Sequence, residues 1–193
     1  MSTNIVIVGG GHAAAQLCAG LAEAGQGGRV HLVCEEATIP YHRPPLSKTF
    51  LKSPDEQPQQ HRAEAWYAES GITMHLGDAA LAIDRAARTV TLQSGAVLGW
   101  ERLVLATGTR ARRLSALAGL SNVALLRAAD EAAQLRSLLA AAQHVTVLGG
   151  GFIGLEVAAT ALALGKQVLV LESAPRLLSR AVSPELSAHV LAT

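Results

Sequence analysis

The chain has 193 residues, of which half are hydrophobic, 16% are charged and 3% are aromatic, and its formal net charge is +1. This balance predicts a folded protein with a substantial core and disfavours nucleic acid as a partner, because there is neither a basic excess nor a set of aromatic stacking platforms. No apolar run is long enough to span a membrane and no charged leader precedes the first strand-like run, so we expect a cytoplasmic protein without a membrane segment.

Residues 4–35 and 144–172 have the same order of predicted elements: a β-branched strand, a glycine turn, an Ala/Leu-rich helix, a second buried strand and a glutamate. The turn and the helix packing position that follows it are occupied by Gly9, Gly11 and Ala14 in the first copy and by Gly149, Gly151 and Gly154 in the second. Glu35 and Glu172 follow the second strands.

This pattern is typical of dinucleotide-binding βαβ units. Backbone N–H groups at a helix N-terminus bind a pyrophosphate that a Cβ would obstruct, and the acidic residue accepts hydrogen bonds from an adenosine ribose. The alternative, that the glycines mark tight turns only, is disfavoured because the whole pattern occurs twice. We therefore predict two adenine-dinucleotide sites.

Residues 41–48 read YHRPPLSK and follow the first unit. Pro44 and Pro45 exclude a helix interior and a central strand, and they hold Arg43 and Lys48 on either side of a stiff segment. A surface loop with two solvated cations is the alternative interpretation of this stretch. Residues 54–60 predict an exposed polar loop.

Residues 71–108 predict a small antiparallel meander with turns at residues 84–85 and 94–95, then a buried parallel strand at 103–106 and a sharp exit at Thr107 and Gly108. Residues 128–142 predict an amphipathic helix, and Ser183 and Pro184 predict the start of another. The two cysteines are expected to be ordinary buried thiols. No metal site is expected, because the seven histidines have no metal-ligand spacing.

The two glycine fingerprints, PYHRPPLSK, LVLATG, and VLVLE occur in an order that resembles the FAD-dependent pyridine nucleotide-disulfide oxidoreductase superfamily, in its ferredoxin and rubredoxin reductase branch. The resemblance implies an α/β fold, with a Rossmann-like FAD-binding domain containing an antiparallel β-meander at 1–111. The first part of a Rossmann-like NAD-binding domain would follow at 112–193. It also implies that the chain is an N-terminal part whose partner is the missing C-terminal half of the same protein.

The resemblance assigns roles to particular residues. Lys48 would lie beside the flavin near N5 and pair with Glu156, which the residues alone explain as a helix-dipole partner in a first turn. The resemblance also places Arg43 near the FAD pyrophosphate and Ala13, Ala80 and Arg127 against FAD, although Arg127 is equally consistent with a surface arginine. The other predicted cofactor-binding residues of this kind are Thr107, Gly108 and Ile153.

These expectations combine into an FAD-dependent NADH reductase that passes electrons to a small iron–sulfur carrier, a ferredoxin or a rubredoxin. Glu172 favours NADH over NADPH, because a carboxylate repels a 2′-phosphate. The Cys-x4-Cys pair of related disulfide reductases is absent, which disfavours direct disulfide reduction. The alternatives are a reductase of the monodehydroascorbate type and a non-catalytic nucleotide-binding fragment, and residues 1–193 alone are expected to have weak or no reductase activity.

Overall fold

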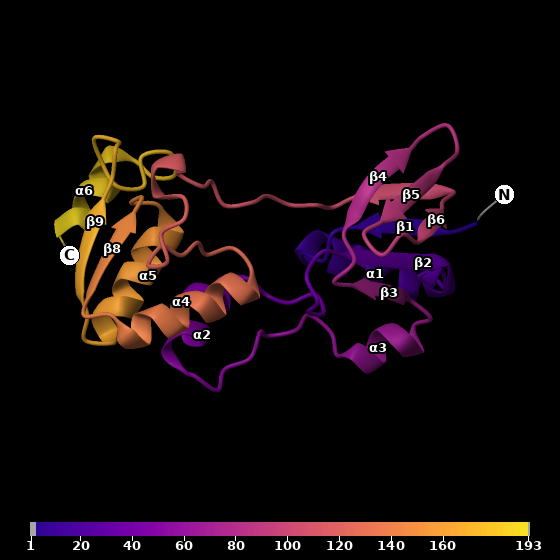
Figure 1. The fold of residues 1–193 in the computed structure, drawn as a ribbon, viewed down its shortest axis with the longest axis horizontal. Helices are drawn as coiled ribbons and strands as arrows, with labels where there is room; N and C mark the ends of the chain where they lie inside the picture. Colours follow the sequence, from indigo (N-terminus) through magenta and orange to yellow (C-terminus); the bar gives the residue numbers. More distant parts are fainter. Residues whose placement is uncertain (1–2, 193) are drawn as a thin grey trace. The chain divides into compact units, whose positions relative to one another are not determined.

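A computed structural model describes residues 3–192, which divide into two compact units (Figure 1). The first unit contains the chain up to Arg43 together with Pro58–Arg110, and the second contains Pro44–Gln57 together with the chain from Ala111 onward. The predicted boundary at 111/112 lies one residue from the division at 110/111. The prediction did not anticipate that Pro44–Gln57 belongs with the second unit.

The first unit is built on a four-stranded parallel sheet of order β3-β2-β1-β7. Its strands are β1 (Ile5–Val8), β2 (Val30–Cys34), β3 (Thr73–Leu76) and β7 (Arg102–Leu105). An antiparallel sheet consists of β4 (Ala80–Asp84), β5 (Thr89–Leu92) and β6 (Val97–Gly99). The helices are α1 (His12–Glu23), α3 (Glu64–Glu69) and a short 3-10 helix, η1 (Gly27–Arg29). This architecture confirms the predicted α/β class.

Strand β1 is buried along its whole length because both of its faces are covered. Ile5 and Ile7 point to one face and pack in the cluster that includes Cys18 of α1. Val6 and Val8 point to the other face and pack in the cluster that includes Val90 of β5. Coverage on both faces explains why a continuous apolar run, rather than an alternating one, forms this strand.

Three details differ from the prediction. Strand β3, which was assigned to the meander, pairs in parallel with β2, because alternating apolar residues do not specify a strand's partner or direction. Strand β7 is parallel as predicted but lies at the edge of its sheet, so Leu105 is 61% exposed rather than buried. Helix α3 was not predicted. The turn after β4 is confirmed, and the Asp84 carboxylate accepts its backbone N–H groups.

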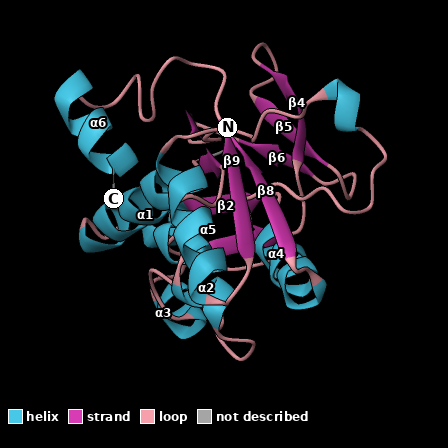
Figure 2. Ribbon diagram, turned by 90° about the vertical axis from the view of Figure 1, so that its left-hand side faces the viewer, coloured by secondary structure: helices cyan, strands magenta, loops and turns pink. Residues whose placement is uncertain are grey.

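The second unit contains a two-stranded parallel sheet of β8 (His144–Leu148) and β9 (Gln167–Leu171). Its helices are α2 (Thr49–Lys52), α4 (Ala129–Ala141), α5 (Phe152–Ala163), α6 (Pro184–Ala192), and the 3-10 helices η2 (Pro44–Ser47) and η3 (Ser115–Leu117). Helix α5 packs on both strands, as Figures 1 and 2 show, and α2 packs on α4. The predicted helices at 128–142 and from Pro184 are confirmed, and the Ser183 hydroxyl accepts the backbone N–H of Leu186.

The prediction of a buried second strand is wrong for the second unit. Side chains of β9 alternate between half-buried and exposed, and Leu169 and Leu171 are 55% and 49% exposed. Within residues 3–192, the sheet has two strands and α5 covers one of its faces. That coverage accounts for the alternation.

Candidate functional site

The first fingerprint turn is shaped by Gly9, whose φ of 119° lies outside the range that other residues readily adopt. A Cβ at Gly9 would lie 2.2 Å from the carbonyl oxygen of Ala106, so the turn is closed against the end of β7. Gly11 is the N-cap of α1, and a Cβ there would meet nothing within 4 Å. The space beside Gly11 is therefore open at the N-terminus of a helix, which fits a pyrophosphate.

The other residues predicted to bind FAD in the first unit lie at the carboxyl ends of the strands or just beyond them. Thr107 and Gly108 follow β7, Glu35 follows β2, and Ala13 and Ala14 lie in the first turn of α1, with Ala14 fully buried. Ala80 begins β4 and packs against the cluster that contains Val8 and Val33. The fold thus brings residues from distant parts of the sequence to the carboxyl-terminal end of the parallel strands, where open α/β sheets bind ligands.

Glu35 and Arg43, two predicted cofactor-binding residues of the first unit, have hydrogen-bond partners that the sequence did not suggest. Both carboxylate oxygens of Glu35 accept hydrogen bonds of 2.8 Å from Nη2 of Arg110. The guanidinium of Arg43 donates to Glu36 at 2.6 Å and to the hydroxyl of Tyr41 at 3.2 Å. Arg43 is therefore held by a neighbouring carboxylate. Its predicted place near the FAD pyrophosphate stays a prediction.

The second fingerprint has the same turn. Gly149 has a φ of 112°, and Gly151 is the N-cap of α5 with open space where a Cβ would lie. A Cβ at Gly154 would lie 2.1 Å from the carbonyl oxygen of Gly149, so this position requires glycine. Ile153, which was predicted to be a cofactor-binding residue, is half-exposed in the first turn of α5.

A cavity of about 520 Å³ lies beside the second fingerprint. Its lining includes Gly149, Gly151, Glu172, Arg112 and Arg180. Glu172 accepts backbone N–H groups from Gly150 and Ala174, both at 2.7 Å. The bonds from Ala174 and Gly150 lower the pKa of Glu172, so its carboxylate stays charged at neutral pH.

Lys48 and Glu156 form an ion pair in the second unit, with Lys48 Nζ and Glu156 Oε1 2.8 Å apart. The hydroxyl of Ser47 donates to the other carboxylate oxygen of Glu156 at 2.5 Å. Burial alone would raise the pKa of Glu156, but the hydrogen bonds from Lys48 and Ser47 and the Lys48 charge outweigh it and lower the pKa. Glu156 is thus ionised at neutral pH.

Glu156 lies beyond the first turn of α5, so its predicted helix-dipole explanation is wrong. Its neighbour one turn later is Thr160, whose buried hydroxyl donates to the carbonyl oxygen of Ser47 at 2.8 Å. Sequence reasoning missed both Ser47 and Thr160. Two features of the sequence could have indicated them: Ser47 directly precedes Lys48, and Thr160 is a polar residue four positions after Glu156 in an otherwise apolar helix.

The segment that carries Lys48 is fixed to α4. Leu51 packs in the cluster of Leu139 and Val157. Nη1 of Arg136 donates to the carbonyl oxygens of Phe50 and Ser53 at the end of α2, and its guanidinium lies 4.4 Å from the centre of the Phe50 ring. Arg136 was also missed by sequence reasoning. Arg127, predicted to contact FAD, lies half-buried just before α4, and its backbone N–H donates to Glu131.

Both cysteines are buried and free, as expected. Burial raises the pKa of Cys18 to about 11, and burial together with the Cys18 and Glu36 charges raises the pKa of Cys34 to about 12. Neither thiol is a thiolate at neutral pH, so neither is suited to disulfide exchange.

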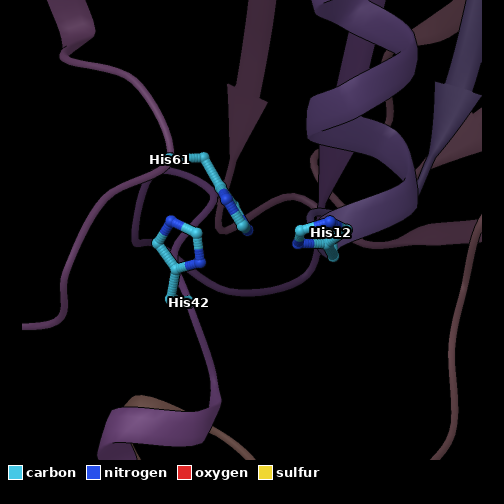
Figure 3. Close-up of side chains that lie close together, drawn as sticks. All are labelled: His12, His42 and His61. Carbon is cyan, nitrogen blue, oxygen red and sulfur yellow. The ribbon is translucent and has the colours of Figure 1, made fainter.

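The prediction of no metal site was based on linear spacing, which cannot show that His12, His42 and His61 come together in the first unit (Figure 3). Burial and the nearby His42, His12 and Arg62 lower the pKa of His61. Residues 3–192 contain no helix with the length and apolar character that a membrane crossing requires.

Comparison with known proteins gives a consistent set of relatives. The family described as pyridine nucleotide-disulphide oxidoreductase matches residues 3–193. The ferredoxin–NAD(+) reductase component of a p-cumate 2,3-dioxygenase system from Pseudomonas putida is 41% identical over 97% of this chain and 47% of that protein. Terpredoxin reductase from a Pseudomonas species is 43% identical over 92% of this chain and 43% of that protein.

Among solved structures, the ferredoxin reductase of the CYP199A2 system from Rhodopseudomonas palustris aligns with a TM-score of 0.93 and 42% identity, over 98% of this chain and 47% of that one. The reductase in a covalent putidaredoxin reductase–putidaredoxin complex aligns with a TM-score of 0.88 and 38% identity, over 96% of this chain and 46% of that one. The chain thus spans about half the length of the relatives it matches.

Proposed function

Because the chain belongs to the pyridine nucleotide-disulphide oxidoreductase family, whose members bind FAD and NAD(H), we propose that its first fingerprint binds FAD and its second binds NADH. The open space beside Gly11 and Gly151, each at the N-terminus of a helix, supports this assignment. The cavity beside Gly149 and Glu172 supports it for the second unit. When bound, the two cofactors supply hydride transfer from nicotinamide to flavin.

The observation that carries the proposal is the Lys48–Glu156 ion pair. Lys48 would hold a positive charge where negative charge develops on the flavin, and Glu156 would hold the Lys48 side chain in place. The bonds of Ser47 and Thr160 fix Glu156 and the backbone next to Lys48, so the charge is positioned in advance. Positioning in advance is what makes such a charge effective, because no reorganisation is needed during the reaction.

We assign a small iron–sulfur carrier as the electron acceptor. Relatives are named as ferredoxin and rubredoxin reductases, and one solved relative is in a complex with putidaredoxin. The raised pKa values of Cys18 and Cys34 argue against a dithiol route. The activity is proposed for a protein of the relatives' length. The 193-residue chain alone is expected to turn over slowly or not at all.

The test is an absorbance spectrum of the FAD-loaded protein before and after addition of NADH without oxygen. Lys48→Met is expected to slow flavin bleaching by roughly 100-fold, because loss of one preorganised donor costs about 100- to 1,000-fold in known sites. Lys52→Met is the matched control, since Lys52 is an exposed lysine four residues away. Equal bleaching rates in the two variants would remove Lys48 from the mechanism, and a protein that takes up no FAD would overturn the FAD assignment.

A further inference from the structure

Three imidazole rings of the first unit converge, although their residues are far apart in the sequence (Figure 3). One ring nitrogen from each of His12, His42 and His61 lies within 4.8 Å of the other two. The centres of the His42 and His61 rings are 3.8 Å apart, and those of His12 and His61 are 4.7 Å apart. Three of the seven histidines thus form one cluster in which His61 lies between the other two.

Backbone hydrogen bonds fix the positions from which the three side chains extend. His12 is the first residue of α1. The backbone N–H of His42 donates to Gln59 at 2.8 Å, and that of His61 donates to Pro40 at 2.9 Å. These bonds clamp the two loop segments that carry His42 and His61 together.

The ring of His61 has one satisfied and one unsatisfied nitrogen. Its Nε2 is buried and has no hydrogen-bond partner. The same ring makes a hydrogen bond to the backbone of Tyr41, which must therefore involve Nδ1. A bond from one ring nitrogen to a backbone carbonyl is the usual way in which a metal-binding histidine is oriented, and it leaves the lone pair of Nε2 available. A buried polar atom without a partner is otherwise unfavourable.

We propose that His12, His42 and His61 form a Zn²⁺ site, with three imidazole ligands and a fourth position for water. Ligands about 2.0–2.1 Å from a tetrahedral zinc ion are about 3.3–3.4 Å apart, and the three nitrogens lie within 4.8 Å of one another, so they must approach by up to about 1.5 Å. All three side chains must turn to close this gap, and His12 is the exposed member of the cluster. The nearby positive charge of Arg62 opposes a cation, but its guanidinium lies over the ring of Trp66, 5.6 Å from the ring centre.

A phosphate is the competing ligand. His12 follows Gly11, which we assign to the FAD pyrophosphate, and protonated imidazoles can donate to phosphate oxygens. The two ligands are separated by measuring zinc binding with FAD and phosphate both absent.

The experiment is a calorimetric titration of the purified chain with Zn²⁺ alone, in phosphate-free buffer without FAD. We expect one ion per chain. His61→Asn and His42→Gln, made separately, should each weaken binding by at least roughly tenfold, because loss of even an indirect partner of a metal ligand costs about 10- to 100-fold. Both substitutions keep the backbone N–H groups that donate to Pro40 and Gln59.

Two control variants remove histidines outside the cluster. His144→Gln changes an exposed histidine of the second unit, and His31→Gln breaks up the pair in which His31 and His75 nitrogens are 3.1 Å apart. Both should keep the wild-type affinity. Far-UV circular dichroism checks the fold of every variant, and because His42 and His61 are changed one at a time, a folding defect in one variant leaves the other as the test.

Three results would overturn the proposal. The first is zinc binding that is unchanged in His61→Asn and His42→Gln. The second is an equal loss in His144→Gln or His31→Gln, which would mean scattered weak binding. The third is no zinc binding by the wild type together with weaker FAD binding by the two cluster variants, which would assign the histidines to the FAD phosphates instead.

Discussion

The two βαβ units share a turn and differ in burial. Gly9 and Gly149 have φ angles of 119° and 112°, so the same local sequence produces the same backbone geometry in both. Strand β1 is buried on both faces by elements from elsewhere in the first unit, whereas β8 and β9 are alternately exposed. A fingerprint thus determines its own turn, while burial of its strands depends on distant neighbours.

The turn makes the same backbone hydrogen bond to the second strand in both units. The backbone N–H of Gly9 donates to the carbonyl oxygen of Val33, and that of Gly149 donates to the carbonyl oxygen of Leu171, both at 2.8 Å. Val33 and Leu171 therefore occupy equivalent positions in the two units.

The residues that follow these positions are different in kind. Cys34 in the first unit is equivalent to Glu172 in the second. A Cβ on Gly10 would meet the Cys34 side chain and a Cβ on Gly150 would meet that of Glu172, which supports this equivalence. Glu35 lies one residue farther along. The two acidic residues, which look alike in the sequence, occupy different structural positions.

The largest expected effect tests the shared turn. Gly9→Ala places a Cβ against a backbone oxygen at an unfavourable φ, which should lower the free energy of unfolding of the first unit by about 3 kcal/mol or more. Gly154→Ala gives the second unit the residue that the first has at Ala14, and the clash should cost the second unit about 1–3 kcal/mol.

Urea unfolding separates these two effects. Trp66 and Trp100, the two tryptophans of the sequence, both lie in the first unit, so their fluorescence reports that unit, while circular dichroism reports both. Gly9→Ala should shift the fluorescence midpoint, and Gly154→Ala should shift the circular dichroism alone. Gly11→Ala is the control, expected within about 0.5 kcal/mol because its Cβ meets nothing. If Gly154→Ala left both signals unchanged, the tight packing at that position would be refuted.

The second prediction tests the difference in burial at equivalent positions. Val33 is 1% exposed and Leu171 is 49% exposed. Val33→Ala should lower the free energy of unfolding by about 2–3 kcal/mol, because the side chain leaves a cavity in the core. Leu171→Ala should cost less than about 1 kcal/mol, although it removes a larger side chain. The same urea experiment measures both. A larger cost for Leu171→Ala would mean that β9 is covered by something outside the described residues.

The features that follow from local sequence were predicted: the two fingerprints, the parallel strand β7, the meander turns and the starts of α4 and α6. The direction of β3 and the exposure of Leu105 and Leu169 were not, because they depend on which strands become neighbours and which lie at an edge. A coarse pattern of apolar residues does not carry that information.

The candidate site likewise combines contacts that the sequence predicted with contacts that it did not. The contact of Lys48 with Glu156 was anticipated from the family resemblance, and the structure has it as an ion pair. The supporting bonds of Ser47 and Thr160 were not, because each joins residues more than 100 positions apart. The histidine cluster escaped notice for the same reason. Its members belong to a helix and two separate loop segments.

The smallest expected effect uses the difference between the two acidic residues. We propose that Glu172 disfavours NADPH, because its charged carboxylate lies in the second-unit cavity and repels a 2′-phosphate. Glu172→Gln removes the charge and should shift the ratio of NADPH to NADH affinity by about tenfold toward NADPH, as measured by quenching or enhancement of nicotinamide fluorescence. Glu35→Gln is the matched control. It removes the same charge beside the first fingerprint and should weaken FAD binding while leaving the nicotinamide ratio unchanged. A shift of that ratio in Glu35→Gln would mean that the two fingerprints do not divide the cofactors as proposed. No shift in Glu172→Gln would mean that Arg112 and Arg180 in the cavity lining already decide the preference.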